Sequence, residues 1–272
     1  MKLQPDFNQT IKELEYYGYA IVKNYLSQNH VQKLLELINS IYEKSSHAEH
    51  SGKPERDSDK YVYNLQGKSE KFIELLGSDF VESVLKHFLN DPYYRALPAQ
   101  DPNYILSYFN ARSSGPKLEL HMDTAIPSQS EKTWIMQIAF PLERFSKSNG
   151  CTFVVPGSHK SGRYVDRELE KLTYLECAPG DLVIWDSRIW HGTSENIDKV
   201  SRWALIATMS CWWVKQRSDV PRTISQVMYQ QLTDKQKSLL GFCSIPPADE
   251  RVQLTYKSGY DSLKKHVSDY FI

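Results

Sequence analysis

From Tyr104 to Val214 the sequence consists of short apolar runs separated by turn residues, and this pattern constrains the fold more than any other feature. The runs are rich in β-branched and aromatic residues, which favour strands over helices. They read YILSYF, KLELHMD, TWIMQIAF, CTFVVP, LTYLECA, DLVIWD and RWALIATMSCWW. Short strands at such regular spacing are typical of a barrel or a two-sheet sandwich. The core of the protein is therefore predicted to be β.

Helical patterns precede this β region. Residues 8–17 carry apolar side chains at helical spacing and stop at Gly18, a residue suited to a left-handed helix cap. The stretch Tyr19–Leu26 has strand composition, and Ser27 then opens an amphipathic helix. Two further helices are predicted at about 69–77 and 79–90.

The segments outside these elements complete the organisation. Residues 46–60 contain no large apolar side chain and are predicted to form a surface loop. Beyond Val214, QVMYQQL and DKQKSLL are predicted to be helical. We expect one domain over 1–272, with a helix-rich part at 1–100, a β core at about 104–214 and a helical C-terminal extension at 215–272.

Composition excludes several classes of partner. Lys plus Arg and Asp plus Glu both number 33, so the net charge is zero and no long-range field attracts nucleic acid. No run approaches the roughly 18 apolar residues of a membrane span, and the start lacks a signal-peptide run. The 4 cysteines form no C-x-x-C pair and are expected to be reduced and buried. We therefore expect a cytoplasmic protein without a membrane or nucleic-acid partner.

One imidazole and one carboxylate are expected to converge in KLELHMD. This run alternates apolar and polar residues, and a strand points residues i and i+2 to the same face. His121 and Asp123 have that spacing. A single H-x-D pair is common by chance, so it gains meaning only from a third ligand.

The third ligand is predicted to be His191, at the end of the run DLVIWDSRIW. Two histidines and one carboxylate on one face of an octahedron leave three adjacent positions open, the arrangement used by non-haem Fe(II) in oxygen chemistry. The iron can then hold a bidentate cosubstrate and O2 together.

Arg202 follows His191 by eleven residues, across a turn-like stretch centred near Ile197 and Asp198. If the two flanking strands pair as a hairpin, Arg202 lies deeper on the sheet face that carries the metal. A guanidinium at that depth suits the far carboxylate of a five-carbon diacid, because its planar fork binds a carboxylate bidentately.

Further blocks accompany these residues in a fixed order. His121-Met122-Asp123 precedes an Asn-Gly pair and a Pro-Gly-Ser-His turn, and Gly180-Asp181 precedes His191. The Asn-Gly pair belongs to Asn149-Gly150-Cys151, and the turn is Pro156-Gly157-Ser158-His159. His191 is followed by Thr193, Asn196 and Arg202. This order resembles the phytanoyl-CoA dioxygenase-like (PhyH) family of Fe(II)/2-oxoglutarate-dependent oxygenases over about residues 15–213.

The resemblance implies a mainly β fold with flanking helices and a double-stranded β-helix core, the jelly-roll or cupin-like architecture. It implies that Fe(II) is bound by His121, Asp123 and His191, with 2-oxoglutarate as cosubstrate and O2 as oxidant. The implied reaction is hydroxylation of an unactivated C–H bond of a small molecule or natural product, with formation of succinate and CO2. Related halogenases replace the carboxylate with a small residue, so Asp123 implies oxygen insertion or desaturation rather than halogenation.

Two further residues are assigned through the resemblance. Thr193 would share the strand face of His191, and the resemblance implies that its hydroxyl contacts the carboxylate of 2-oxoglutarate nearest the metal. Many relatives have a tryptophan on the strand before the Asn-Gly pair, and Gln137 takes that position here. Gln137 is therefore expected to donate a hydrogen bond to 2-oxoglutarate or to meet the substrate.

Two alternatives use the same residues. A non-catalytic cupin-like metal or small-molecule binding protein is expected to lack a ligand or the arginine, and neither is missing. A zinc hydrolase would use the same three ligands with a metal-bound water, but it leaves Arg202 and the Asn-Gly and Pro-Gly-Ser-His blocks without a role. The sequence predicts neither the prime substrate nor the oligomeric state.

Overall fold

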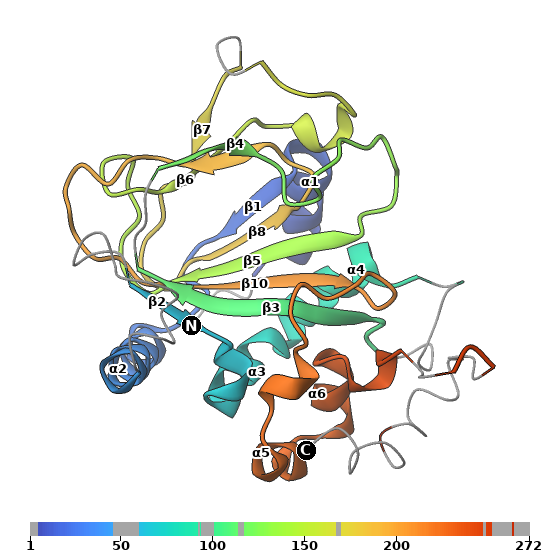
Figure 1. Ribbon diagram of the computed structural model, residues 1–272. Helices are drawn as coiled ribbons and strands as arrows, with labels where there is room; N and C mark the ends of the chain where they lie inside the picture. Colours follow the sequence, from blue (N-terminus) through green and yellow to red (C-terminus); the bar gives the residue numbers. More distant parts are fainter. Residues whose placement is uncertain are drawn as a thin grey trace. The chain divides into compact units, whose positions relative to one another are not determined.

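The structure is a computed structural model (Figure 1). It describes residues 5–45, 60–91, 93, 101–113, 117–166, 170–246, 249–251 and 263. Apart from Lys60, the predicted loop at 46–60 lies outside these residues. Internal contacts group the chain into two compact units, one of residues 1–63 and 110–207 and the other of 64–109 and 208–272. The single domain expected from the sequence stays a prediction.

A six-stranded sheet supplies one layer of the first unit. Its strand order is β1-β8-β5-β10-β3-β2, and the β1–β8, β5–β8 and β2–β3 pairs are antiparallel. β3 and β10 continue along the chain from this unit into the other. The strands are β1 (Tyr19–Val22), β2 (Tyr61–Tyr63), β3 (Tyr104–Arg112), β5 (Ile135–Pro141), β8 (Leu182–Asp186) and β10 (Ala204–Cys211).

A four-stranded antiparallel sheet supplies the other layer, in the order β4-β9-β6-β7. In Figure 1, β4, β6 and β7 lie above β1, β8 and β5. The strands are β4 (Leu118–His121), β6 (Thr152–Val154), β7 (Thr173–Tyr174) and β9 (His191–Thr193). Two layers of antiparallel strands confirm the mainly β prediction. The run LTYLECA, expected to be one strand, is paired only as β7 and as a bridge at Cys177.

The core of this unit lies between the two sheets. Val183 and Trp185 of β8 and Ala139 of β5 pack there with Val154 of β6. Alternation within each strand explains this, because every second side chain of a strand turns to the same face. The buried Cys151 and Cys177 belong to the same cluster. All 4 cysteines are buried and free, as the sequence predicts.

Two helices flank β1, and their ends follow local rules. α1 (Phe7–Tyr17) starts where Asp6 accepts a hydrogen bond from the backbone of Gln9, and it ends at Gly18, whose φ is +83°. α2 (Gln28–Lys44) starts at Ser27, whose hydroxyl accepts from the backbone of His30. Side-chain caps of this kind satisfy amide groups that lack partners inside the helix. The predicted helix, strand and helix order is confirmed.

The second unit is mainly helical. Its 3-10 helices are η2 (Leu65–Gly67), η4 (Pro221–Thr223) and η5 (Phe242–Ser244), and its α-helices are α3 (Glu70–Leu76), α4 (Asp79–Leu89), α5 (Gln226–Gln231) and α6 (Asp234–Leu239). Within the residues that the structure describes, the first unit contains the 3-10 helix η3 (Ser158–Lys160). Both predicted helices beyond Val214 are confirmed as α5 and α6. No described helix combines the length and the apolar composition that a bilayer crossing requires.

Candidate metal centre

His121 and Asp123 lie where β4 ends, and His191 lies where β9 begins. β4 and β9 are antiparallel, and the Cα of His121 pairs with that of His191 across them. The chain turns directly after His121, and the backbone N–H of Asp123 donates a 3.0 Å hydrogen bond to the carbonyl of Ser187. The sheet register therefore pairs the two imidazoles, and the turn that follows places the carboxylate.

The three side chains form the kind of cluster that can hold one metal ion. One ligand atom from each lies within 4.8 Å of the others. Nε2 of His191 is 3.5 Å from Oδ2 of Asp123, and the two imidazole centroids are 4.3 Å apart. His191 is buried, whereas His121 and Asp123 are partly accessible. The cluster is therefore buried on the side of His191 and accessible to solvent on the side of His121 and Asp123.

The hydrogen bonds of the imidazoles fix which nitrogen faces the metal. Nδ1 of His121 is 2.8 Å from the carbonyl oxygen of Glu119, and Nδ1 of His191 is 3.0 Å from that of Ile189. A carbonyl oxygen can only accept, so Nδ1 carries the proton in both rings and Nε2 keeps its lone pair. In metal-binding histidines, the ring nitrogen that does not bind the metal typically donates such a hydrogen bond, which orients the ring. The donor set therefore fits Fe(II) or another divalent ion that binds imidazole.

Electrostatics also favour metal binding at His191. Burial lowers the pKa of His191, the carboxylate of Asp123 raises it, and the neighbouring His121 lowers it. The lowered pKa favours the neutral ring near neutral pH. Neutral imidazole is the form that binds a metal.

Arg202 is buried, at 5% exposure, and its guanidinium is held by the main chain. Nε donates to the carbonyl of Asn149 at 2.8 Å, and Nη2 donates to the carbonyl of Gly150. The guanidinium carbon lies 4.1 Å from the ring centroid of Phe145. Within the described residues Arg202 forms no ion pair with a carboxylate. A buried charge normally needs such a partner.

A second arginine adds to this positive charge. Burial, followed by the charge of Arg112, lowers the pKa of Arg202 to about 10. Arg202 therefore stays protonated at neutral pH. The guanidinium of Arg112 lies over the ring of Tyr61, 5.3 Å from its centroid, and its buried Nε has no hydrogen-bond partner. Sequence reasoning missed Arg112, because one arginine at a strand end is usually a surface residue.

The expected hairpin between the strands of His191 and Arg202 is wrong. β9 belongs to the four-stranded sheet and pairs with β4 and β6, whereas β10 belongs to the six-stranded sheet. The connection between them pairs instead with the turn before β6. Asn196 bridges to Asn149, and the backbone N–H of Ile197 donates to Ser148 at 2.8 Å. The chain therefore crosses between sheets after β9.

Thr193 and Gln137 occupy different positions around the centre. Thr193 ends β9 and pairs with Leu118 and Thr152. It lies two residues beyond His191, so the two side chains share a face of the sheet. Gln137 lies in β5, paired with Trp185, and its amide nitrogen donates to Oδ2 of Asp123 at 2.8 Å. Its assignment to 2-oxoglutarate stays a prediction.

Sequence reasoning also missed a buried ion pair beside the centre. Asp186 and Arg188 are 4% and 5% exposed, and Nη2 of Arg188 lies 2.6 Å from Oδ2 of Asp186. Arg188 also donates to the carbonyl of Ser130, and Thr133 donates to Asp186 at 2.9 Å. These bonds tie the segment after Asp123 to the turn at Ser187. Two charged residues inside the apolar run DLVIWDSRIW were the available signal, because buried charges must be paired.

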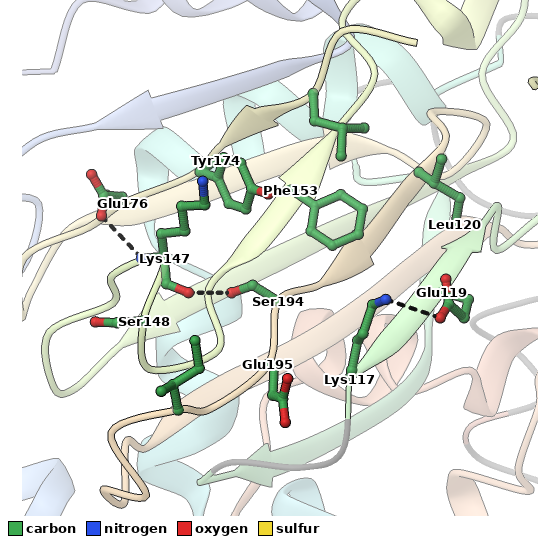
Figure 2. A pocket seen from close by; sticks show the side chains of 12 residues that line it. Lys117, Glu119, Leu120, Lys147, Ser148, Phe153, Tyr174, Glu176, Ser194 and Glu195 are labelled. Atoms are coloured by element: carbon green, nitrogen blue, oxygen red, sulfur yellow. Dashed lines mark hydrogen bonds and ion pairs between the residues drawn. The ribbon is translucent and has the colours of Figure 1, made fainter. Parts of the chain in front are cut away.

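A groove of about 710 Å³ lies on the four-stranded sheet, on the face opposite to the one that carries His191 (Figure 2). Leu120, Phe153 and Tyr174 line it together with the ion pair of Lys117 and Glu119, whose nitrogen and oxygen are 3.1 Å apart. Phe153 pairs with Gly192, whereas its neighbour Val154 pairs with His191. Successive strand residues face opposite ways. The groove is therefore separate from the metal centre, and none of the three metal-ligand candidates lines it.

Comparison with known proteins places the chain in a family. The family model for phytanoyl-CoA dioxygenase (PhyH) matches residues 14–204. Dioxygenase af480 of Aspergillus fumigatus is 27% identical over 150 residues, which cover 52% of this chain and 48% of that protein. Dioxygenase trt7 of Aspergillus terreus is 24% identical over 238 residues, covering 81% of this chain and 80% of that protein.

Other relatives match over a shorter part of their length. An uncharacterized protein of Mycobacterium tuberculosis is 29% identical over 116 residues, which cover 40% of this chain and 41% of that protein. The chain thus spans less than half the length of this relative and of the Aspergillus fumigatus dioxygenase.

A solved structure shares the fold. The epimerase SnoN from nogalamycin biosynthesis, in complex with Fe³⁺, α-ketoglutarate and nogalamycin RO, superposes with a TM-score of 0.57. It is 16% identical, and the match covers 75% of this chain and 83% of that one. This similarity confirms the predicted jelly-roll architecture. The family model, which matches more than half of the residues, shows that the chain belongs to the phytanoyl-CoA dioxygenase (PhyH) family.

Proposed function

We propose that this chain is an Fe(II)- and 2-oxoglutarate-dependent dioxygenase that hydroxylates an unactivated C–H bond of a small organic molecule. The observation that carries the proposal is the convergence of His121, Asp123 and His191 within 4.8 Å, in the same unit as the buried Arg202, which has no carboxylate partner among the described residues. Family membership supports it. So does the presence of iron and α-ketoglutarate in SnoN, which has the same fold.

Each residue of the centre has a separate role in this proposal. His121 and His191 bind the metal through Nε2, because their Nδ1 atoms are engaged with main-chain carbonyls. Asp123 contributes the carboxylate. When bound, iron with 2-oxoglutarate supplies O2 activation, and the cosubstrate ends as succinate and CO2. Three protein ligands leave three of six octahedral positions for cosubstrate and O2.

Arg202 binds the C5 carboxylate of 2-oxoglutarate in this proposal. The buried guanidinium is kept in place by Asn149, Gly150 and Phe145, so little side-chain freedom is lost when the diacid arrives. A carboxylate there also forms the direct ion pair that Arg202 lacks among the described residues, where the charge of Arg202 lowers the pKa of the Glu143 carboxyl without an ion pair. Thr193 contacts the carboxylate nearest the metal, from the same sheet face as His191.

The proposal extends to substrate class and location. SnoN holds a small-molecule ligand, nogalamycin RO, according to the description of its complex. We therefore propose a small molecule or natural product as prime substrate. The four free, buried cysteines support a reducing compartment, and we propose the cytoplasm.

The zinc-hydrolase alternative uses the same ligands but leaves Arg202 without a function. To separate the two, the metal-free protein is loaded with Fe(II) without oxygen, and 2-oxoglutarate is added. We expect the weak visible charge-transfer band of the chelate. On admission of O2, succinate should form and increase when a true substrate is present. Absence of the band, together with tighter binding of Zn(II) and no effect of 2-oxoglutarate, would refute the oxygenase proposal.

The prime substrate is identified with the same protein. Small-molecule libraries are screened for compounds that raise succinate release, and the products are examined by mass spectrometry. A gain of one oxygen atom supports hydroxylation. A loss of two hydrogen atoms would instead indicate desaturation, and an unchanged mass would indicate isomerisation.

A further inference from the structure

Gln137 makes a contact that its sequence position does not suggest. It lies in β5, paired with Trp185 of β8, and is 1% exposed. Its Nε2 donates a 2.8 Å hydrogen bond to Oδ2 of Asp123. An amide with this contact can act on the metal centre without binding 2-oxoglutarate.

The oxygen of Asp123 that Gln137 contacts is the one that lies near His191. Oδ2 of Asp123 is also the atom 3.5 Å from Nε2 of His191, and Nε2 is the nitrogen that would bind a metal, because Nδ1 is engaged with the carbonyl of Ile189. The main chain of Asp123 is held separately, through its N–H bond to the carbonyl of Ser187. The amide of Gln137 therefore restricts rotation of the carboxylate about a backbone that is already fixed.

We infer that Gln137 is a positioning residue, which orients the carboxylate of Asp123 for the metal before 2-oxoglutarate binds. The inference rests on the proposed function and gives Gln137 a role other than cosubstrate binding. A neutral amide suits this role, because it donates a hydrogen bond without adding charge. Lysine would add a positive charge next to the metal, and glutamate would add a second carboxylate.

A positioning role predicts which binding affinity changes when Gln137 is substituted. Without the amide, the carboxylate of Asp123 must be ordered by the metal itself, so metal affinity falls even without cosubstrate. Loss of an outer partner of a metal ligand typically lowers metal affinity by about 10- to 100-fold. A residue that bound only 2-oxoglutarate would leave the affinity for metal alone unchanged.

The test measures Ni(II) binding by calorimetry on the whole metal-free chain, without 2-oxoglutarate. Ni(II) is used because imidazole binds it tightly and it does not oxidise. Gln137→Met keeps the length of the side chain and removes the donor, and Gln137→Leu is a second variant in case one of them packs badly. We expect each to weaken Ni(II) binding by about 10- to 100-fold. Far-UV circular dichroism and thermal unfolding verify that each variant is folded.

A double-mutant cycle tests whether the effect passes through Asp123. Gln137→Met is combined with Asp123→Ala, and Ni(II) binding to the two remaining histidines is measured. The substitution at Gln137 should then change Ni(II) affinity by less than about twofold, because its partner is absent. The same loss in both backgrounds would overturn the inference, since Gln137 would then act by another route.

Arg202→Gln supplies the matched contrast. This variant should keep the Ni(II) affinity of the unsubstituted protein and lose affinity for 2-oxoglutarate, the reverse of Gln137→Met. If Gln137→Met retains its Ni(II) affinity and loses 2-oxoglutarate affinity instead, Gln137 is a cosubstrate ligand and the inference is wrong. If the unsubstituted protein binds no Ni(II) through His121 and His191, the proposed function itself fails.

Discussion

Nε of Arg202 donates a 2.8 Å hydrogen bond to the main-chain carbonyl oxygen of Asn149, and this contact joins the arginine to the turn of the Asn-Gly pair. Gly150 has a φ of +90°, a conformation that glycine adopts without strain. A Cβ built on Gly150 would lie 3.3 Å from Nη2 of Arg202. The turn therefore presents two carbonyls to the guanidinium and leaves room for it.

Substitution of Arg202 should weaken 2-oxoglutarate binding selectively. Arg202→Gln removes the charge, and a hydrogen bond to a charged group contributes roughly 1.5–3 kcal/mol, or about 10- to 100-fold in affinity. We expect the KM for 2-oxoglutarate to rise by that factor in a succinate-release assay with saturating iron. Arg163→Gln is the control, because that side chain is 74% exposed. An unchanged KM for Arg202→Gln would mean that another residue binds the far carboxylate.

Removal of either imidazole should abolish stable metal binding. In His121→Ala and His191→Ala a metal-coordinating group is missing, so the loss of Co(II) affinity should exceed the roughly 100-fold upper value for losing an outer hydrogen-bond partner. Anaerobic titration of the visible Co(II) spectrum measures this loss. His30→Ala is the control, since His30 is exposed on α2. If His30→Ala bound Co(II) as weakly as the other two variants, the assay would be reporting nonspecific histidine binding.

A side chain at Gly192 should destabilise the fold. It lies in β9 next to His191, and an added Cβ would lie 2.5 Å from both the carbonyl oxygen of Leu118 and Cζ of Phe153. Overpacking of this kind costs about 1–3 kcal/mol. We expect Gly192→Ala to lower the free energy of unfolding by that amount in urea titrations of the metal-free protein.

The matched control for that prediction is Gly77→Ala. An added Cβ on Gly77 would meet no atom closer than 3.8 Å, and its φ of −91° suits alanine. The free energy of unfolding of this variant should lie within about 0.5 kcal/mol of that of the unsubstituted protein. Equal destabilisation by the two substitutions would show that crowding between β9 and its neighbours is not the cause.

The sequence predicted what depends on local pattern. Ser27 was expected to begin a helix, and its capping contact lies only three residues away. His121 and Asp123 were paired by strand alternation, but β4 ends at His121 and the turn that follows places the carboxylate of Asp123. The pairing of Asn196 with Asn149 was not predicted, because it depends on which distant segment the chain meets after β9. The hairpin was the simplest local choice, and it is wrong.

The bond between Gln137 and Asp123 was unpredictable for a similar reason. The two residues are 14 apart, and Gln137 lies in β5 whereas Asp123 lies in the turn after β4, so no periodicity relates them. Which side chain reaches the carboxylate depends on how closely β5 approaches the turn after β4. That distance is a property of packing between the two layers, and the sequence specifies it only through the whole core.

His159 should make the protein less stable in mild acid. Its side chain is 2% exposed, and its Nδ1 is buried without a hydrogen-bond partner. Burial lowers its pKa, the charge of Asp186 raises it, and the charge of Arg188 lowers it. The folded protein therefore takes up a proton on His159 at lower pH than the unfolded chain, whose histidines titrate near about 6.5.

The sign of the pH effect follows from this difference. Between the lowered folded pKa and about 6.5, the unfolded chain binds more protons, so the free energy of unfolding decreases as pH falls. One such proton contributes at most about 1.4 kcal/mol per pH unit. His159→Gln should reduce this slope when urea unfolding is measured from pH 7.5 to 5.0 with a chelator present. His30→Ala, which alters an exposed histidine, should leave the slope as it is. If His159→Gln gave the slope of the unsubstituted protein, the acid sensitivity would have to come from other buried groups such as His191.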